Sequence, residues 1–387
     1  MHKCFFSLLV FLFSLAFLVA CSSQSVSGEK RIPLQREKMT VEELAGQMLV
    51  CGFSGTELTD DFENFLRQYK IGGVILFSGN MRNLQQTRRL CSDIQKVVKE
   101  TTGFPAFICT DQEGGAITRL PPDFKKLPGA YELASYGSPE LVYRAGRLTA
   151  KELLLCGINV DFAPIADINS NPNNPIIGRR SYGSSPNKVS IYSGRMMAGL
   201  ISGGVLCAVK HFPGHGDTDT DSHLGLPKVN KTYKDLADFE LKPFKAAVDG
   251  GVPIVMTAHI LFPQIDNDYP ATMSKKILTD ILRTDMGFDG LIITDDLEMA
   301  AIRKHYGLVN GALSAVNAGA DLLCLSVYSD GGSDICRALA ANIDRRRLEL
   351  SVQRIIAAKK RIAEKPQGGP ALLESFNSEM EKITRGR

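Results

Sequence analysis

The sequence contains no tryptophan and no block of basic residues longer than Arg345-Arg346-Arg347. The lack of a basic stripe argues against a nucleic-acid-binding protein. No motif recurs at a spacing of roughly 20 to 50 residues, which excludes propellers and solenoids. Hydrophobic residues make up 44% of the 387 positions and the net charge is only +3, so wholesale disorder is excluded. These features favour a globular protein with a neutral or small ligand.

The N-terminus has the pattern of a bacterial export signal. Residues 5–20 are almost entirely apolar, about as long as a signal h-region, and Ala20 leads directly into Cys21. Small residues before a cysteine form the cleavage pattern of a lipoprotein. We therefore expect residues 1–20 to be a signal peptide, Cys21 to carry lipid, and residues 21–38 to be a polar tether. This predicts a membrane-anchored, extracytoplasmic protein on the periplasmic face or cell surface; an uncleaved N-terminal anchor would leave the rest of the chain on the same side.

Cysteine usage does not indicate a disulfide framework. Of nine cysteines, Cys4 leaves with the signal and Cys21 takes the lipid, so seven remain, an odd number without a CxxC pair. Four of these lie in or next to apolar runs: Cys109, Cys156, Cys207 and Cys324. The sequence therefore predicts buried free thiols.

Eight apolar, β-branched runs alternate with segments of helical periodicity. The runs cover residues 46–53, 72–78, 105–111, 157–165, 204–211, 252–259, 289–295 and 318–326, and the clearest helical segments are 83–99, 139–155, 187–202, 233–249, 275–286 and 349–364. Runs that are apolar throughout indicate strands buried on both faces, as in a parallel sheet covered by helices. The pattern predicts a single-domain α/β protein, a (β/α)8 TIM barrel over residues 39–365, with a C-terminal tail at 366–387.

An open doubly wound sheet is the structural alternative. Such a sheet normally carries a glycine-rich phosphate fingerprint after its first strand. Here that position reads Gly52-Phe53-Ser54-Gly55, which is too short.

Ionisable side chains gather at the ends of the predicted strands, where a TIM barrel places its active site. They are Asp111 and Glu113, Asp167, Lys210 and His211, His259, and Asp295 and Asp296. Charges near a barrel core are costly unless they are paired or used. This edge is therefore the predicted site.

The segment after the fifth run, residues 210–223, contains three of the six histidines. Pro213 and Gly214 prevent a helical H-x-x-x-H zinc pair. Asp217, Asp219 and Asp221 resemble the start of a calcium loop, but Ser222 and Lys228 occupy its required Gly and Glu positions. We therefore expect neither a metal nor another cofactor.

Proton transfer suits this loop better. Asp221 and His223 are two residues apart and would point to the same side of an extended loop. The carboxylate can then fix the tautomer of the imidazole and raise its pKa, as a general acid–base requires. If Asp295 faces this pair across the barrel mouth, the site holds a carboxylate nucleophile opposite a proton donor.

These motifs resemble the β-N-acetylglucosaminidase branch of the family 3 glycoside hydrolases. The resemblance covers roughly residues 40 to 365 and rests on four segments in the family's order: Asp111-Gln112-Glu113-Gly114-Gly115 with Arg119, Ile177-Gly178-Arg179-Arg180-Ser181-Tyr182, Lys210 to His223, and Ile293-Thr294-Asp295-Asp296-Leu297-Glu298-Met299. It implies that Asp295 is the nucleophile, His223 the proton donor and acceptor, and Asp221 its partner. It also implies sugar-binding roles for Asp111, Arg119, Arg180, Lys210 and His211. The family's nucleophile matches Asp295 rather than its neighbour Asp296.

The resemblance implies retaining hydrolysis of terminal β-linked N-acetylglucosamine through a covalent glycosyl-enzyme. The expected partners are an N-acetylglucosamine-containing oligosaccharide or muropeptide and, through the lipid, a membrane; we expect no nucleic acid and a monomer. Both a cell-wall fragment and a chitin fragment remain open as substrates. Phosphorolysis, a two-domain β-glucosidase of the same family, and a lipoprotein that only binds sugar are the other functions kept open.

Overall fold

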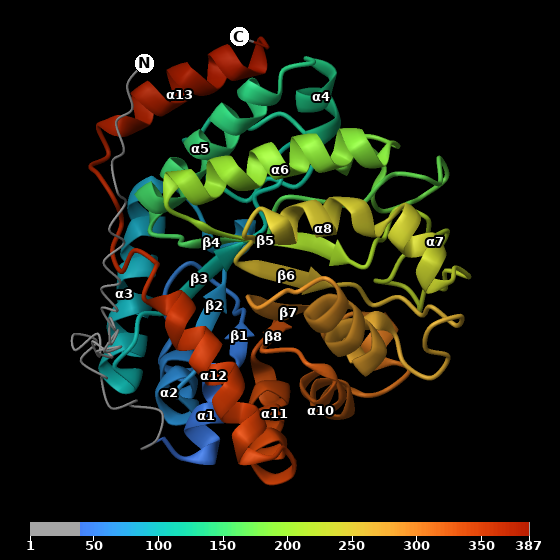
Figure 1. The fold of residues 1–387 in the computed structure, drawn as a ribbon. Coiled ribbons are helices and arrows are strands. Elements are labelled where there is room, and N and C mark those ends of the chain that lie inside the picture. The colour runs from blue at the N-terminus through green and yellow to red at the C-terminus, as the bar shows by residue number, and fades with distance from the viewer. Residues whose placement is uncertain (1–38, 387) are drawn as a thin grey trace, which may run out of the picture. The chain divides into compact units, whose positions relative to one another are not determined.

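The computed structural model describes residues 39–386, so the predicted signal peptide, Cys21 and the tether lie outside the described part of the chain. Eight parallel strands form a closed barrel in which each strand pairs with its neighbours in chain order and β8 pairs with β1 (Figure 1). The strands are β1 Leu49–Cys51, β2 Gly73–Ile75, β3 Phe107–Thr110, β4 Val160–Asp161, β5 Leu206–Phe212, β6 Ile254–Thr257, β7 Leu291–Asp296 and β8 Leu322–Leu325. The predicted (β/α)8 barrel is confirmed.

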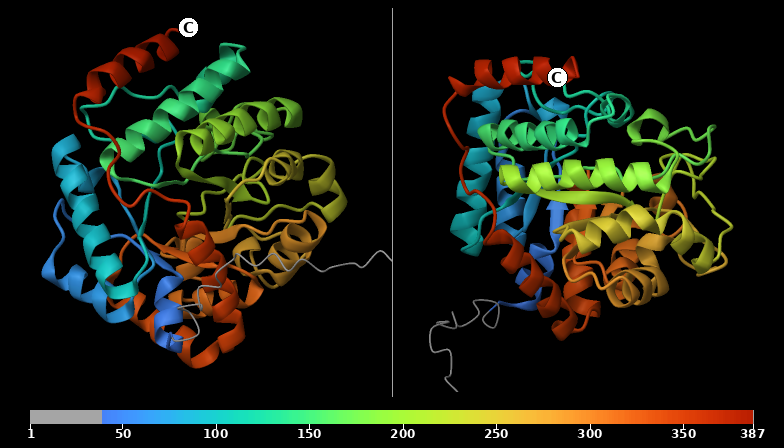
Figure 2. Two further views of the ribbon diagram at one scale, coloured as in Figure 1. Left: turned by 60° about the vertical axis from the view of Figure 1, so that its left-hand side comes forward. Right: turned by 45° about the horizontal axis from the view of Figure 1, so that its top comes forward.

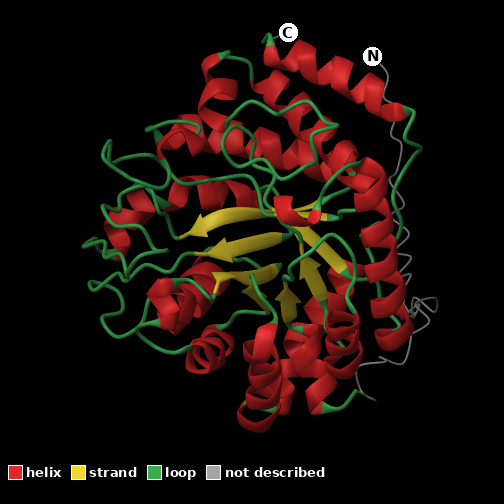
Figure 3. Cartoon of the chain, turned by 180° about the vertical axis from the view of Figure 1, so that it is seen from behind, coloured by secondary structure: helices red, strands yellow, loops and turns green. Residues whose placement is uncertain are grey.

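Helices surround the strands on the outside of the barrel, as Figures 2 and 3 show. The α-helices are α1 Val41–Gln47, α2 Asp60–Tyr69, α3 Leu84–Thr102, α4 Ala130–Ser135, α5 Pro139–Cys156, α6 Pro186–Gly203, α7 Tyr233–Asp238, α8 Leu241–Asp249, α9 Ala300–Arg303, α10 Leu308–Ala318, α11 Ser329–Asn342, α12 Arg345–Lys359 and α13 Leu372–Thr384. Single-turn 3₁₀ segments are η2 Ser78–Asn80, η3 Gly178–Arg180 and η4 Ala271–Met273, and η5 Lys276–Asp285 is a π-helix.

The long helices begin and end at residues that their local chemistry selects. Before α5, the Ser138 hydroxyl accepts a hydrogen bond from the Leu141 amide (3.2 Å), and Pro139 occupies the first helical position. After the helix, Gly157 adopts a left-handed conformation with φ of 95°, which glycine tolerates without strain. The next chain segment is thereby turned back into β4.

Three features differ from the sequence-based expectations. The predicted helix over 233–249 is two helices, α7 and α8, because Phe239 leaves helical geometry. The first predicted strand overlaps α1, whose start at Thr40 is fixed by a capping box with Glu43. The expected C-terminal tail contains α13, which packs against α5 and buries Met380 and Ile383.

The seven cysteines of the described chain are free and buried, as predicted. They lie within the hydrophobic core, where burial raises the pKa of thiols such as Cys109 and Cys324. In residues 39–386, no helix has the length and apolar character to cross a bilayer.

The amino end of the barrel is closed by α12. Lys359 is almost completely buried there; its ammonium donates to the side-chain Oε1 atom of Gln47 (3.0 Å) and lies over the ring of Phe107, the first residue of β3. Burial lowers the pKa of Lys359 from 10.5 to about 7. The interior of the fold therefore disfavours the charged form of this lysine.

We expect Lys359 to make stability rise with pH. Between pH 7 and 10.5 the unfolded chain binds a proton at Lys359 that the folded chain has lost. The free energy of unfolding should therefore rise by about 1.4 kcal/mol per pH unit in this window because of this residue. Urea unfolding should show that Lys359→Met lacks this rise, whereas Lys360→Met, at an exposed neighbour, keeps it. Equal pH slopes for Lys359→Met and the parent chain would contradict the assignment.

Candidate active site

The predicted site residues come together in one pocket at the carboxyl ends of the strands. Its walls include seven of the eight residues expected to contact substrate or catalyse the reaction: Asp111, Arg119, Arg180, Lys210, His211, His223 and Asp295. The eighth, Asp221, contacts His223 directly. Segments up to 184 residues apart in the chain therefore meet here because the parallel strands all end at this edge.

A buried cluster of alternating charges forms one wall of the pocket. The Lys210 ammonium, on β5, lies 2.6 Å from Asp111 and 2.7 Å from Glu113, two residues that follow β3. The carboxylate of Glu113 also accepts two hydrogen bonds from the guanidinium of Arg180, both at 2.8 Å. Burial alone would raise the pKa of Glu113, but Lys210 and Arg180 hold that pKa far below its ordinary value.

Glu113 is the residue of this wall that the sequence-based assignment of substrate contacts left out. It joins Lys210 to Arg180 and so fixes where both cations point. A permanently ionised, paired carboxylate is unsuited to donate a proton, so Glu113 is a positioning residue. Its place in the Asp111-Gln112-Glu113 motif was the available sequence signal, but only the fold shows that Arg180 reaches it.

Replacing Glu113 by Gln should weaken substrate use chiefly through KM. The substitution keeps the shape, but it leaves Lys210 paired with Asp111 alone and removes the carboxylate that pairs with Arg180. We expect KM to rise roughly tenfold or more and the free energy of unfolding to fall by about 3 kcal/mol. Steady-state kinetics and urea unfolding measure the two effects, with Glu57→Gln at an exposed position as the control. An unchanged KM would show that the arrangement of the two cations does not matter for binding.

Asp167 orients the histidines that follow β5. It is fully buried, and its carboxylate contacts the His211 Nδ1 atom at 2.7 Å and accepts the His215 amide at 2.7 Å. Burial alone would raise the pKa of Asp167, but His211 and His215 bring that pKa below the ordinary value. Because Asp167 contacts Nδ1, the Nε2 atom of His211 stays available at the pocket that this histidine lines.

The two adjacent carboxylates at the end of β7 have different surroundings. Asp295 accepts the Asp296 amide at 2.8 Å, and although burial alone would raise its pKa, the imidazoles of His211 and His259 bring the pKa below the ordinary value. Asp296 instead accepts the amides of Ser326 (2.9 Å) and Glu298 (3.1 Å), and burial raises its pKa. The surroundings of Asp295 thus favour its ionised form, which a nucleophile requires, whereas Asp296 braces the backbone.

Asp221 and His223 form a pair, but through a turn instead of the expected extended loop. The Asp221 carboxylate contacts the His223 Nδ1 atom at 2.7 Å and accepts the His223 amide at 2.8 Å, while the Asp221 carbonyl accepts the Leu224 amide. A local turn brings the two side chains together because one carboxylate can accept both the ring and the amide. The His223 side chain is 61% exposed, so its other nitrogen remains accessible at the pocket.

Buried contacts anchor the loop that carries this pair. His215 contacts the Thr218 hydroxyl through Nδ1 (2.8 Å) and the Ser222 hydroxyl through Nε2 (3.2 Å). Burial lowers the pKa of His215 to about 4, which keeps the ring neutral near pH 7. The Ser222 carbonyl also accepts the Ala301 amide. His215 is therefore a support of the loop.

The remaining histidine at a strand end, His259, is used by the fold. Its ring contacts the Thr272 hydroxyl at 2.8 Å and the Asp296 carbonyl at 3.0 Å, which occupies both nitrogens.

Arg119 lies over the Phe77 ring, and its buried Nε atom has no hydrogen-bond partner within residues 39–386. Arg119 can therefore donate to a bound ligand.

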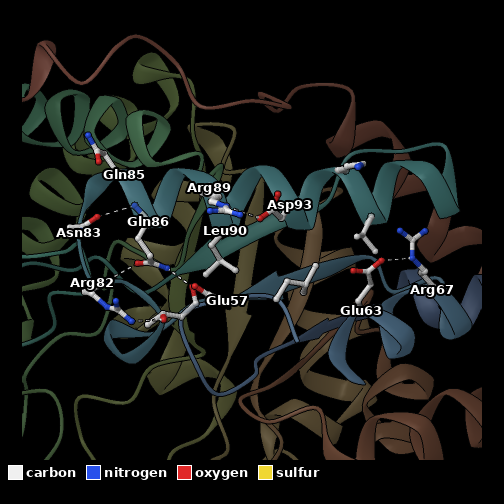
Figure 4. A pocket seen from close by; sticks show the side chains of 14 residues that line it. Glu57, Glu63, Arg67, Arg82, Asn83, Gln85, Gln86, Arg89, Leu90 and Asp93 are labelled. Atoms are coloured by element: carbon white, nitrogen blue, oxygen red, sulfur yellow. Dashed lines mark hydrogen bonds and ion pairs between the residues drawn. The ribbon is translucent and has the colours of Figure 1, made fainter. Parts of the chain in front are cut away.

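The described residues contain no group of three or more His, Cys, Asp and Glu side chains that could hold a metal ion. A second concave surface lies between α2 and α3 (Figure 4). Two of its arginines pair with acidic residues of the same groove, Arg67 with Glu63 (2.7 Å) and Arg89 with Asp93 (3.9 Å). This groove offers no facing nucleophile and proton donor.

Comparisons with known proteins agree with this geometry. The model of the glycosyl hydrolase family 3 N-terminal domain matches residues 40–364. The β-hexosaminidase of Thiobacillus denitrificans is 35% identical over 75% of this chain and 81% of its own length. β-Hexosaminidase A of Pseudoalteromonas piscicida is 34% identical over 83% of this chain, which spans only 58% of that protein.

A solved structure is similar over most of the described chain. The family 3 β-N-acetylglucosaminidase of Paenibacillus sp. str. FPU-7 is 37% identical and superposes with a TM-score of 0.85, covering 90% of this chain and 69% of that one. Fold, sequence and the arrangement of the pocket therefore agree. The chain belongs to family 3 of the glycosyl hydrolases.

Proposed function

We propose that this protein is a retaining exo-β-N-acetylglucosaminidase. The observation that carries the proposal is the presence, in one pocket, of the ionised Asp295 and the His223–Asp221 pair. The relatives named β-hexosaminidase and β-N-acetylglucosaminidase support the choice of sugar. A pocket closed on one side by a charged wall suits removal of a terminal sugar.

The proposed reaction has two steps. The Asp295 carboxylate attacks the anomeric carbon while His223 gives a proton to the leaving oxygen, and the bond between sugar and aglycone breaks. His223, now neutral, then takes a proton from water, which attacks the same carbon and releases the sugar from Asp295. Asp221 holds the ring in place through its contact with Nδ1. The wall formed by Asp111, Glu113, Lys210 and Arg180 would hold the sugar hydroxyls.

A two-domain β-glucosidase mechanism is less well supported, since the barrel already supplies its own acid–base candidate at the pocket. Phosphorolysis fits one feature of the proposed mechanism. After His223 has given up its proton, the acid–base beside the covalent intermediate is a neutral imidazole and not a carboxylate, so phosphate could approach in place of water.

The substrate and cellular location are further parts of the proposal. We propose that terminal N-acetylglucosamine is removed from peptidoglycan fragments, and that lipidated Cys21 anchors the enzyme outside the cytoplasm. The cleavage pattern before Cys21 supports the anchor, and an extracytoplasmic site gives access to cell-wall fragments.

The decisive experiment offers the protein matched 4-nitrophenyl β-glycosides of N-acetylglucosamine and glucose. Preference for the N-acetylglucosaminide supports the proposal, and preference for the glucoside contradicts it. Sugar binding without turnover of either would indicate a binding protein. Adding phosphate and identifying the product as free sugar or sugar phosphate separates hydrolysis from phosphorolysis.

A further inference from the structure

The helix α12 has two sharply different faces. One face is buried against the amino end of the barrel and carries Leu348, Val352, Ile355 and Ile356. The exposed positions recur at helical spacing on the opposite side: Arg346, Leu350, Gln353, Ala357, Lys360 and Arg361. The second face therefore points away from the barrel.

This outer face is strongly basic. Residues 345–365 contain eight basic and two acidic side chains, but Lys359 is buried on the inner face and Arg347 and Arg354 pair with Asp321, so five basic side chains remain for the outer face. Both acidic side chains are already paired, Glu349 with Arg345 and Glu364 with Lys99. Within the described chain, ion pairs are absent at the exposed residues Arg346, Lys360, Arg361 and Lys365. Exposed Leu350 and Ala357 lie between the charges.

The described chain begins beside the outer face of α12, directly after the predicted tether. Arg347 donates to the Ala320 carbonyl just before β8, and Lys359 reaches Gln47 just before β1, so α12 crosses the amino ends of the strands. At the start of the helix, Arg345 donates to the carbonyl of Met39, the first described residue (2.9 Å). Met39, where the described chain begins, therefore lies beside the basic face, at the opposite end of the barrel from the pocket.

The length of the tether brings this face within reach of the bilayer. Residues 21–38 span at most about 60 Å when fully extended, and a flexible chain of this length has a typical end-to-end distance of about 25 Å. A basic surface held this close to anionic headgroups gains affinity from each lysine or arginine that approaches them.

We propose that the outer face of α12 docks on the surface of an anionic phospholipid bilayer. This inference rests on the proposed lipid anchor. Docking through the amino end of the barrel directs the pocket away from the membrane, toward the space in which polymeric or fragment substrates diffuse. The anchor supplies attachment, and the basic face supplies orientation.

The test measures the exposure of α12 in the full, anchored chain. The seven described cysteines are buried, so Ala357→Cys can be labelled with a fluorophore, and Asn187→Cys, exposed at the start of α6, serves as the control on the opposite end. In phosphatidylcholine vesicles that contain phosphatidylglycerol, the probe at residue 357 should be protected from acrylamide quenching. The probe at residue 187 should be quenched equally with or without phosphatidylglycerol.

Charge reversal gives the matched comparison. Arg346→Glu/Lys360→Glu/Arg361→Glu should lower the ratio of docked to undocked protein on the order of 100-fold. Lys228→Glu/Lys275→Glu/Lys304→Glu makes the same change in charge at exposed positions elsewhere and should leave the ratio unchanged. Equal quenching at residue 357 in both lipids, or unaltered protection in the first variant, would overturn the proposal. Equal protection by a soluble polyanion would also overturn the assignment to a lipid surface.

The same preparation tests the proposed lipid anchor and the proposed enzymatic activity independently of the docking. Flotation with pure phosphatidylcholine vesicles reports the lipid anchor, and turnover of the chromogenic N-acetylglucosaminide reports the enzyme. A chain that floats and turns over substrate, but whose probe at residue 357 stays exposed on anionic vesicles, refutes only the docking of α12.

Discussion

Replacing Asp295 by Ala should lower kcat by roughly 10⁴-fold or more while the protein remains folded. The side chain lines the pocket and is the proposed nucleophile, so its loss removes the atom that forms the covalent bond. Few polar contacts depend on it, because within residues 39–386 its one hydrogen bond is the one it accepts from the neighbouring Asp296 amide. Steady-state kinetics with the aryl N-acetylglucosaminide and urea unfolding together measure the effect.

The adjacent carboxylate provides the matched control. Asp296→Asn keeps an oxygen that can accept the Ser326 and Glu298 amides, so the backbone at the end of β7 should stay in place. We expect this variant to lose about tenfold in kcat, far less than Asp295→Ala. If Asp296→Asn lost as much activity as Asp295→Ala while folded, or more, the nucleophile would have been assigned to the wrong residue.

Removing the His223 side chain should affect poor leaving groups much more than good ones. A nitrophenolate departs with little protonation, whereas the oxygen of a disaccharide needs a proton as the bond breaks. We expect His223→Ala to lose roughly 10³-fold in kcat/KM on an N-acetylglucosamine disaccharide and about tenfold on the aryl glycoside. With the aryl substrate the second step should become limiting, because water then lacks its general base.

Asp221→Ala should show a weaker form of the same pattern, since Asp221 orients the imidazole without transferring the proton itself. Equal losses on both substrates in His223→Ala, without an accumulated intermediate, would indicate a binding role for His223. Glu113, Asp167 and His259 are poor replacements as the acid–base, because each is already held by buried partners.

The barrel was predictable because its strands are buried on both faces, which produces continuous apolar runs that the sequence displays directly. The location of the site followed from the same pattern, since charged residues such as Asp111 and Asp295 come where those runs end. The residues that meet in the pocket are distant in the chain, but strand order alone brings them to one edge.

Features that depend on tertiary contacts could not be predicted from the sequence in this way. Nothing local indicates that Arg180, on a loop after β4, pairs with Glu113 after β3. Likewise, the turn that joins Asp221 to His223 depends on supports from His215 and Ala301. The burial of Lys359 follows from α12 crossing the barrel, which the periodicity of its sequence does not specify.

The most direct test of the account is to identify the residue that becomes covalently attached to the sugar. His223→Ala should accumulate the glycosyl-enzyme when it is supplied with the aryl N-acetylglucosaminide, because the second step is slowed. After an acid quench and proteolysis, mass spectrometry should find one N-acetylhexosaminyl group on the peptide that contains residues 291–296, with fragmentation placing it on Asp295. Attachment to Asp296 or to another residue, or rapid turnover with no covalent adduct at any time, would contradict the proposed mechanism.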